Sequence, residues 1–354
     1  MDSKIFVPLL PSLLHLAVVK ESMNLYNDFH TETLDEAYRR IQQGNSMASE
    51  DSENYPGCNS AQKKLIRIPP LLRKRVREAI HGLKSGVELW RKEHSSILEL
   101  DDGECIFYWR CDGTIDTVKT AEHLVLNSNI DIRKRFYIAC MYCLEKSIQT
   151  LWAEIEATGK TEDLETTDYC AARFWVRWLL DESRLPWKQA TRQYLSISYP
   201  AIRFSSFLPS LRPEERFSFL CTFNFATYDD LRFCLYSLTA KEEKEILRLC
   251  SITVLRSYLQ WPLRSLFLET AEKMWKYIDE RKYVILDDLL SSRINRKVFD
   301  FYDLLECFWN TSPNSFREGA KEIPHLSEKV ESCFHEMNRK RKAHSDEEIQ
   351  KIKN

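Results

Sequence analysis

Residues 69–93 read PPLLRKRVREAIHGLKSGVELWRKE, and this stretch carries the clearest signal for the class of fold. Its apolar residues recur at steps of three or four with charged residues between them, which is the pattern of an α-helix with one buried face. The sequence therefore predicts a helix that follows the two prolines and ends near Glu93. The apolar positions of this helix are Leu72, Val76, Ala79, Ile80, Leu83, Val87 and Trp90.

Glycine is rare in this chain, and its distribution extends the same prediction. Only eight glycines occur in 354 residues, and none lies between Gly159 and Gly319. Left-handed turns, tight hairpins and phosphate-binding loops depend on glycine, so this stretch predicts helices joined by short breaks. We expect an all-α fold of stacked antiparallel helix pairs, which form either a degenerate helical repeat or a helical bundle.

The composition divides the chain into four parts. Residues 1–43 predict N-terminal helices, the first of them a buried one. Residues 44–62 are polar, acidic and rich in Ser, Asn and Gly, which predicts a flexible linker or loop, because such a segment buries little apolar surface. Residues 63–336 predict the helical array, and residues 337–354 predict a charged C-terminal tail.

Local signals refine the array. Aromatic residues run into Asp112-Gly113, which predicts one small β-hairpin at 105–116. Thr227 and Thr239 are each followed three residues later by an acidic residue, a pattern typical of a helix start.

The dipeptide Arg-Phe recurs in the middle of the chain, starting at residues 135, 173, 203, 216 and 232. We expect the Phe to point inward and the Arg stem to cover the apolar edge, an arrangement that a stacked helical hairpin could reuse. The spacing is irregular, so neither a repeat nor a non-repeating bundle is favoured by it alone.

Two basic clusters are candidate binding sites. The stretch 63–77 holds seven basic residues and no acidic one, and its proposed partner-binding residues are Arg73, Lys74, Arg75 and Arg77. Such a cluster suits an acidic partner, a phosphate group or nuclear import, and it equally suits a solvated helix face that neutralises the nearby acidic segment 50–53. The second cluster resembles a nuclear-import signal and equally suits the negative end of a helix. It consists of Arg339, Lys340, Arg341 and Lys342.

Cys140 and Cys143 form the only CxxC pair, which makes them weak candidates for a metal or redox site. A zinc site would need two further ligands, and both cysteines fall on an apolar stripe that predicts core packing.

The acidic pairs Asp229-Asp230 and Asp287-Asp288 lack the third carboxylate of a DDxxD magnesium motif, so we interpret them as acids at helix starts. The sequence predicts no catalytic residue, no metal and no cofactor.

The overall composition constrains location and partners. The net charge is −2, so any binding to a polyanion depends on a local patch. The eleven cysteines are odd in number and widely spread, which is typical of free cysteine in a reducing compartment and predicts an intracellular protein, cytoplasmic or nuclear. No apolar run is long enough to span a membrane, and we expect no membrane partner. The oligomeric state stays open.

Five runs of this sequence carry a resemblance to known proteins: DGTIDTVKTA at 112–121, DIRKRF at 131–136, ACMYC at 139–143, Leu151-Trp152 and LLHLAVVK at 13–20. They resemble the sequences of a large, uncharacterised family of helical proteins that is expanded in arachnids. The resemblance covers the first half of the chain most closely, and it implies an all-helical fold without a known activity or site residue.

Together these observations predict a non-catalytic helical scaffold or adaptor that binds another protein. Two alternatives remain: a nuclear protein associated with nucleic acid through the 63–77 cluster, and an enzyme whose site cannot be recognised from residue types alone.

Overall fold

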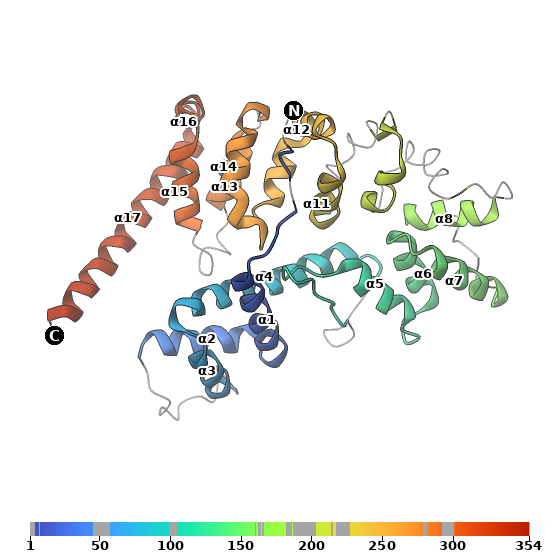
Figure 1. The fold of residues 1–354 in the computed structure, drawn as a ribbon, viewed down its shortest axis with the longest axis horizontal. Coiled ribbons are helices and arrows are strands. Elements are labelled where there is room, and N and C mark those ends of the chain that lie inside the picture. Colours follow the sequence, from blue (N-terminus) through green and yellow to red (C-terminus); the bar gives the residue numbers. More distant parts are fainter. Residues whose placement is uncertain are drawn as a thin grey trace. The chain divides into compact units, whose positions relative to one another are not determined.

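The structure is a computed structural model, and it shows an all-α protein (Figure 1). Fifteen α-helices and several short 3-10 helices lie in the described part of the chain, and no β-strand does. The chain divides into two compact units, unit 1 (Met1–Ile246) and unit 2 (Leu247–Asn354). The structure describes residues 4–44, 57–98, 105–181, 186, 203–216, 227–278, 282–291 and 301–353, except for positions 7, 160, 162, 163, 165 and 214.

Unit 1 begins with four helices, in which α1 packs along α4 and α2 packs on both α3 and α4 (Figure 1). The buried hydroxyl of Ser22 on α1 donates to the carbonyl oxygens of Val18, at 2.7 Å, and of Val76 on α4, at 3.2 Å. These helices are α1 (Leu13–Asp28), α2 (Thr31–Gln42), α3 (Cys58–Arg67) and α4 (Pro70–His94).

Helix α4 confirms the prediction from 69–93, since it begins at Pro70, ends at His94 and buries the predicted stripe from Val76 to Trp90. The expected loop at 44–62 needs correction, because α3 already begins at Cys58. Cys58, Ala61 and Gln62 are buried in it, although the local composition is polar. The rest of that stretch, 45–56, lies outside the described residues.

The N-terminal apolar run was expected to be a buried helix, and this is only partly right. Val18 and Val19 are buried, because the later turns of α1 face α4. Leu10 and Leu13, in the middle of this run from Ile5 to Val19, are 88% and 85% exposed. Further upstream, Phe6 is buried, and the carboxylate of Glu243 accepts the backbone N–H of Ile5 at 2.8 Å.

The second half of unit 1 is built around α6, which packs against α5, α7 and α8. Helix α11 packs against the two 3-10 helices η1 and η2. The elements are α5 (Thr117–Leu126), α6 (Ile132–Met141), α7 (Glu145–Ala157), α8 (Cys170–Leu180), η1 (Phe204–Ser206), η2 (Leu208–Ser210), α11 (Tyr228–Ser237) and the start of α12 (Ala240–Ser257).

The predicted hairpin at 105–116 forms as a loop with a single antiparallel bridge, between Trp109 and Ile115. Gly113 takes the left-handed conformation at its turn, with φ of 88°. The pairing stops there because Asp116 is already the N-cap of α5, where its side chain accepts the N–H of Lys119. Regular strands were therefore the wrong expectation, although the turn was placed correctly.

The predicted helix starts at Thr227 and Thr239 are both present. The hydroxyl of Thr227 accepts the N–H of Asp230 at the start of α11. Thr239 and Glu242 form a reciprocal capping box, in which the Glu242 carboxylate accepts the N–H of Thr239 at 2.7 Å and the Thr239 hydroxyl accepts the N–H of Glu242 at 3.3 Å.

Several arginines near helix starts reach back to backbone carbonyl oxygens of the segment that precedes the helix, and this explains part of the Arg-Phe recurrence. Arg135 donates to the carbonyl of Val125 at 2.7 Å, and Arg173 donates to that of Thr167 at 2.7 Å. Phe136 and Phe174 are buried beside them, as expected. Arg216, Arg73 and Arg264 make the same kind of bond to Leu211, Leu65 and Leu259.

Unit 2 has an aromatic core. The ring centroids of Phe267 and Phe308 lie 5.6 Å apart, and those of Trp275 and Phe316 lie 5.0 Å apart. The elements are the end of α12, which bends at Cys250, then η4 (Leu263–Leu266), α13 (Phe267–Met274), η5 (Trp275–Tyr277), α14 (Lys282–Ser291), α15 (Phe301–Thr311), α16 (Asn314–Lys321) and α17 (Pro324–Lys353).

The stretch that was expected to be a charged C-terminal tail, residues 337–354, continues helix α17 as far as Lys353. The buried positions of α17 run from Leu326 through Val330 and Cys333 to Met337, so the first part of this helix packs on unit 2. From residue 338 onward the sequence is polar, yet the helix continues to Lys353. The boundary at 337 therefore marks a change of composition within one helix.

The single glycine of unit 2 marks a close approach between helices α16 and α14. A Cβ atom on Gly319 would overlap the hydroxyl oxygen of Tyr283, whose ring packs on Phe316. We expect Gly319→Ala to destabilise the protein by about 1–3 kcal/mol, because the ring has to be displaced. Urea unfolding of the full chain, followed by circular dichroism, measures this loss.

Gly86→Ala is the matched control. A Cβ at Gly86, inside α4, would lie 4.0 Å from the Ile115 side chain, an ordinary contact. This variant should therefore gain about 0.5–1 kcal/mol from the better helix propensity of alanine. Equal effects of the two substitutions would contradict the close approach.

Candidate functional site

Three arginines surround the acidic pair Asp229-Asp230 at the start of α11 in unit 1. Arg110 comes from the bridged loop, Arg203 precedes η1, and Arg232 lies one turn along α11. The side chains of Arg203 and Arg232 are only 9% and 7% exposed. Three separate segments of chain therefore contribute charges to one buried group.

Asp229 is the centre of this charge cluster. Its Oδ1 accepts from Arg110 and from Arg232, both at 3.0 Å, and its Oδ2 accepts from Arg203 at 3.2 Å and from the Thr117 hydroxyl at 3.0 Å. Burial opposes ionisation of Asp229, yet the three guanidinium groups hold its pKa below the ordinary value. Asp229 is therefore a carboxylate at neutral pH.

Asp230 has a different role. It accepts the backbone N–H of Phe204 at 2.7 Å and that of Ser205 at 3.1 Å, so it ties η1 to α11. Burial raises its pKa, although Arg203, at 3.7 Å, and hydrogen bonds from Ser205 and Phe204 oppose the shift. The two adjacent acids thus have pKa shifts in opposite directions.

The last turn of α4 adds a buried histidine. The Nδ1 of His94 lies 2.7 Å from the carbonyl oxygen of Trp90, and its Nε2 lies 2.8 Å from the hydroxyl of Tyr142. Because the carbonyl can only accept, Nδ1 carries the proton and Nε2 accepts from Tyr142. Burial lowers the pKa of His94 to about 4, so the ring is neutral at physiological pH.

Glu93 is the acid that this cluster does not neutralise. Burial, followed by the charges of Asp229 and Asp230, raises the pKa of Glu93 to about 7, although Arg203 opposes the shift. The three guanidinium groups already share four carboxylates, those of Asp112, Asp116, Asp229 and Asp230. An ionised Glu93 therefore adds an unmatched negative charge.

The cluster of Asp229, Asp230 and the three arginines can join segments of the chain better than it can act on a substrate. The carboxylate oxygens of Asp229 and Asp230 are occupied by donors of the chain itself, and Arg232 also binds Asp112 at 3.2 Å. Within the described residues, no three His, Cys, Asp or Glu side chains are grouped as metal ligands. The buried charge cluster links the bridged loop, η1 and α11.

Sequence reasoning found only part of this cluster. The interpretation of Asp229-Asp230 as acids at a helix start is correct for position, but Asp230 is buried, Asp229 is half-buried, and arginines bind both. The signal that could have indicated the cluster is the Arg-Phe dipeptide, which occurs at both Arg203 and Arg232.

The second acidic pair of the sequence lies in unit 2, where Asp288 binds Arg256 at 2.6 Å and Asp287 binds Lys329 at 2.7 Å.

Cys140 and Cys143 differ in environment. Cys140 is fully buried in α6, and burial raises the pKa of its thiol. Cys143 lies beyond the end of α6 in a left-handed conformation with φ of 55°, where the N–H of Leu144 donates to the carbonyl of Ala139. This is a Schellman helix end, in which cysteine occupies the position usual for glycine. The two thiols therefore do not share one helical face.

The four basic residues proposed from 73–77 have separate roles. Arg73 donates to the carbonyl oxygens of Leu65 and Ile68 at the end of α3, at 3.1 and 2.9 Å. Arg77 binds Asp35 at 2.8 Å, and its guanidinium lies over the ring of Tyr38. The side chains of Lys74 and Arg75 are exposed.

The C-terminal basic residues lie on α17. Arg339, Arg341 and Lys342 are exposed, and the side chain of Lys340 lies outside the described residues. Arg341 binds Glu306 at 2.6 Å and Asp303 at 3.1 Å on α15. One member of the proposed import signal is thus engaged within unit 2.

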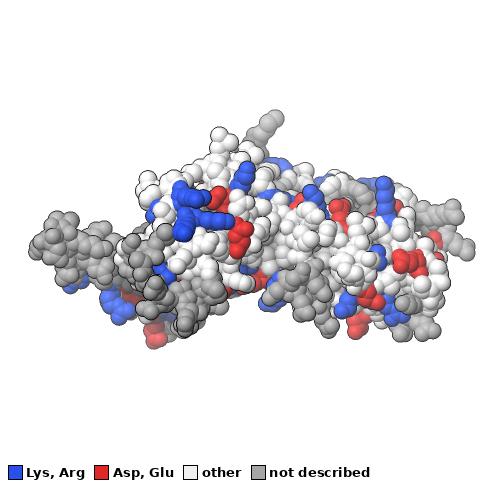
Figure 2. Space-filling model, turned by 90° about the horizontal axis from the view of Figure 1, so that it is seen from below, with Lys and Arg blue, Asp and Glu red and all other residues white. Residues whose placement is uncertain are grey.

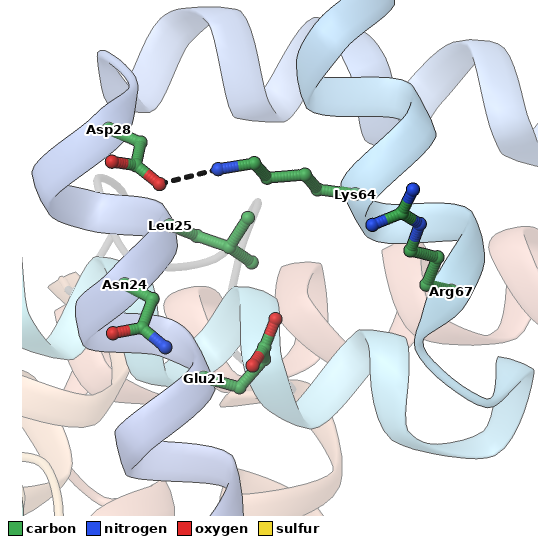
Figure 3. Close-up of a pocket in the computed structure, with 6 residues that line it drawn as sticks. All are labelled: Glu21, Asn24, Leu25, Asp28, Lys64 and Arg67. Carbon is green, nitrogen blue, oxygen red and sulfur yellow. Dashed lines mark hydrogen bonds and ion pairs between the residues drawn. The ribbon is translucent and has the colours of Figure 1, made fainter.

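A hollow of about 310 Å³ lies between α1 and α3 (Figure 3). Leu25 forms its floor, and Lys64 reaches across it to Asp28 at 2.6 Å. Glu21 and Arg67 line the side nearer the α3–α4 turn without a bond between them (Figure 3). The mixed signs of these side chains do not define one ligand.

Figure 2 shows basic and acidic side chains interspersed over the face it views, without one field of a single charge. In the part of the chain that the structure describes, no helix is both long and apolar enough to cross a membrane.

Comparison of the chain with protein-family models, with curated proteins and with solved structures finds no match.

The unmatched Glu93 makes stability depend on pH. Since its pKa is raised to about 7 from 4.5, the folded state keeps the proton over a range in which the unfolded state has lost it. Glu93 therefore lowers the free energy of unfolding by up to about 3 kcal/mol as pH rises from about 4.5 to 7. His94, whose pKa is lowered from 6.5 to about 4, raises it by a similar amount between pH 4 and 6.5, so the two contributions nearly cancel in the wild type up to about pH 6.5. The contribution of Glu93 is measured as the difference between the wild type and Glu93→Gln in urea unfolding at a series of pH values.

Glu93→Gln should remove this contribution and make the protein more stable than the wild type at pH 8. Glu154→Gln is the matched control, because Glu154 is exposed on α7. A difference in the free energy of unfolding between Glu93→Gln and the wild type that stays constant from pH 4.5 to 8 would show that Glu93 is not the group responsible.

Proposed function

We propose that this chain is a non-catalytic helical scaffold that binds another protein. The observation that carries the proposal is the exposure of large aliphatic side chains at helix ends of unit 1, while the core stripes of the same helices are filled. These side chains are 77–91% exposed, and contact with a partner would remove this apolar surface from water. They are Leu10, Leu13, Leu71 and Leu126.

The charges support a protein partner over a nucleic acid. Binding to a phosphate backbone needs several free cations on one surface. In the 63–77 cluster, Arg73 is bound to backbone carbonyls, Arg77 to Asp35 and Lys64 to Asp28. A nucleic-acid role would therefore rest on the few remaining exposed cations of that cluster.

The reactive side chains also support a role without catalysis. Burial raises the pKa of the Cys105 thiol to about 12 and that of Cys234 above its ordinary value, which makes both poor nucleophiles. The buried charge cluster is occupied by its own partners. An intracellular location, cytoplasmic or nuclear, is part of this proposal, and it is supported by the free thiols of the cysteines that the structure describes.

Proximity labelling in cells that produce the full chain tests the proposal. We expect a reproducible set of protein neighbours that falls at least fivefold when the exposed leucines are replaced in Leu10→Ser, Leu13→Ser, Leu71→Ser and Leu126→Ser combined. The matched control replaces exposed charged residues of unit 1, in Lys92→Ser, Lys146→Ser and Arg212→Ser combined, and should leave the set unchanged.

Extracts treated with nuclease separate the two kinds of partner. Capture that survives nuclease and changes little between 50 and 200 mM salt supports a protein partner, because neutralising many phosphates gives a steep salt dependence. Loss of capture after nuclease treatment, or a neighbour set that the leucine variant does not alter, would contradict the proposal.

A further inference from the structure

We propose that the surface at the end of α11 and the start of α12 binds an extended segment of a partner protein that carries a phenylalanine. The chain's own residues 4–9, which we call the N-terminal arm, occupy this surface in the structure, and the partner would displace them. Position 7 of the arm lies outside the described residues. The inference rests on the proposed function, and it names the chemistry of the partner.

Two prolines keep the arm separate from the first helix. Pro8 and Pro11 have no backbone N–H, and a proline disfavours the helical conformation in the residue before it. Helix α1 therefore begins only at Leu13, after its N-cap Ser12. Figure 1 shows the arm, in dark blue, as an irregular segment that runs from α12 to the start of α1.

The arm is held through backbone groups that any extended segment possesses. The carboxylate of Glu243, in the first turn of α12, accepts the N–H of Ile5 at 2.8 Å and that of Phe6 at 3.4 Å. Both donors belong to the main chain, so these bonds recognise an extended backbone and leave the choice of side chains open.

One side chain of the arm supplies the apolar contact. Phe6 is 1% exposed, whereas Lys4 and Pro8 are both exposed. Burial of apolar surface is the main favourable contribution to such a contact. A partner segment therefore needs an aromatic side chain at the position of Phe6.

The two ends of the arm contact the last turn of α11. The amino group of Lys4 donates to the carbonyl oxygen of Tyr236 at 3.2 Å, and the backbone of Leu9 lies beside the hydroxyl of the same tyrosine. The last carbonyl groups of a helix have no partner inside the helix, and a cation is favoured there. A lysine two residues before the phenylalanine thus suits the same surface.

This surface favours exchange of its occupant over loss of its occupant. Glu243 is 1% exposed, and within the described residues the hydrogen bonds to its carboxylate come from the arm alone. A buried carboxylate that loses its donors is costly. An incoming segment with two free N–H groups restores both bonds.

The arm of a second copy has no advantage over the chain's own arm. It would make the same contacts, whereas the chain's own arm is tethered beside the surface at an effective concentration of about millimolar. A partner protein can add contacts outside the surface. Leu10 and Leu13, which are exposed directly after the arm, offer such contacts.

Fluorescence anisotropy with the full chain tests this inference. The probe is a labelled peptide with the sequence of residues 4–12, KIFVPLLPS. Phe6→Ala weakens the competing arm, so this variant should bind the probe at least tenfold more tightly than the wild type does. Ile5→Pro removes the N–H that donates to Glu243 and should have the same effect, which keeps the test valid if Phe6→Ala does not fold.

Matched variants and peptides separate the surface from general effects. Leu10→Ala changes an exposed side chain beside the arm and should bind the probe as the wild type does. Adding Glu243→Ala to Phe6→Ala should abolish the gain, whereas adding Glu154→Ala, at an exposed acid of α7, should keep it. A peptide with Ala in place of Phe should bind at least tenfold more weakly.

Three results would overturn the inference. The first is equal binding of the probe by the wild type and by both arm variants, and the second is a gain that survives Glu243→Ala. The third is a wild-type dimer in analytical ultracentrifugation that Phe6→Ala abolishes, because the occupant would then be the arm of a second copy.

Proximity labelling tells failure of the inference apart from failure of the proposed function. Phe6→Ala should raise capture of the neighbours at least twofold, and addition of Glu243→Ala should remove the rise. If neither variant changes the neighbours while the combined leucine variant loses them, the scaffold proposal stands and this surface is not its binding site. If no variant changes the neighbours, both are wrong.

Discussion

The guanidinium of Arg203 is buried in unit 1, and the elements around it depend on its being neutralised. It donates to the Thr117 hydroxyl at 2.5 Å and to Asp229 at 3.2 Å, and it lies 3.7 Å from Asp230. A charge out of water is costly unless it is both paired and hydrogen-bonded. The start of α5, the segment before η1 and the start of α11 therefore have to assemble together, although they lie far apart in sequence.

Arginine serves the rest of the chain over shorter distances. Arg135 binds the carbonyl oxygen of Val125 in the last turn of α5, and Arg173 binds that of Thr167 in the loop before α8, so each fixes the chain that leads into its helix. Most exposed side chains of the described residues are polar or charged, and only a few are large and aliphatic. Leu71, at the start of α4, is the most exposed of these aliphatic side chains, and Arg75 follows it one turn later.

The sequence predicted what depends on local periodicity and missed what depends on distant contacts. The apolar stripe from Val76 to Trp90 predicted α4, and Thr239 predicted the start of α12. Both signals consist of residues that lie in the predicted helix or directly before it. Helix α3 was missed because its polar composition hides the burial of Gln62. The buried charge cluster was missed because nothing near Arg203 in sequence indicates that Asp229, 26 residues later, will neutralise it.

Hydrogen exchange of Arg203→Gln, read by mass spectrometry on the full chain, tests the central claim most directly. Removing the charge should raise exchange at least tenfold in residues 105–117, in η1 and in α11, while α1 and α2 keep their protection. Arg135→Gln, which loses only a local bond to Val125, should affect the turn between α5 and α6 alone. Unchanged exchange around Asp229 and Asp230, or an equal rise throughout unit 1, would contradict the account.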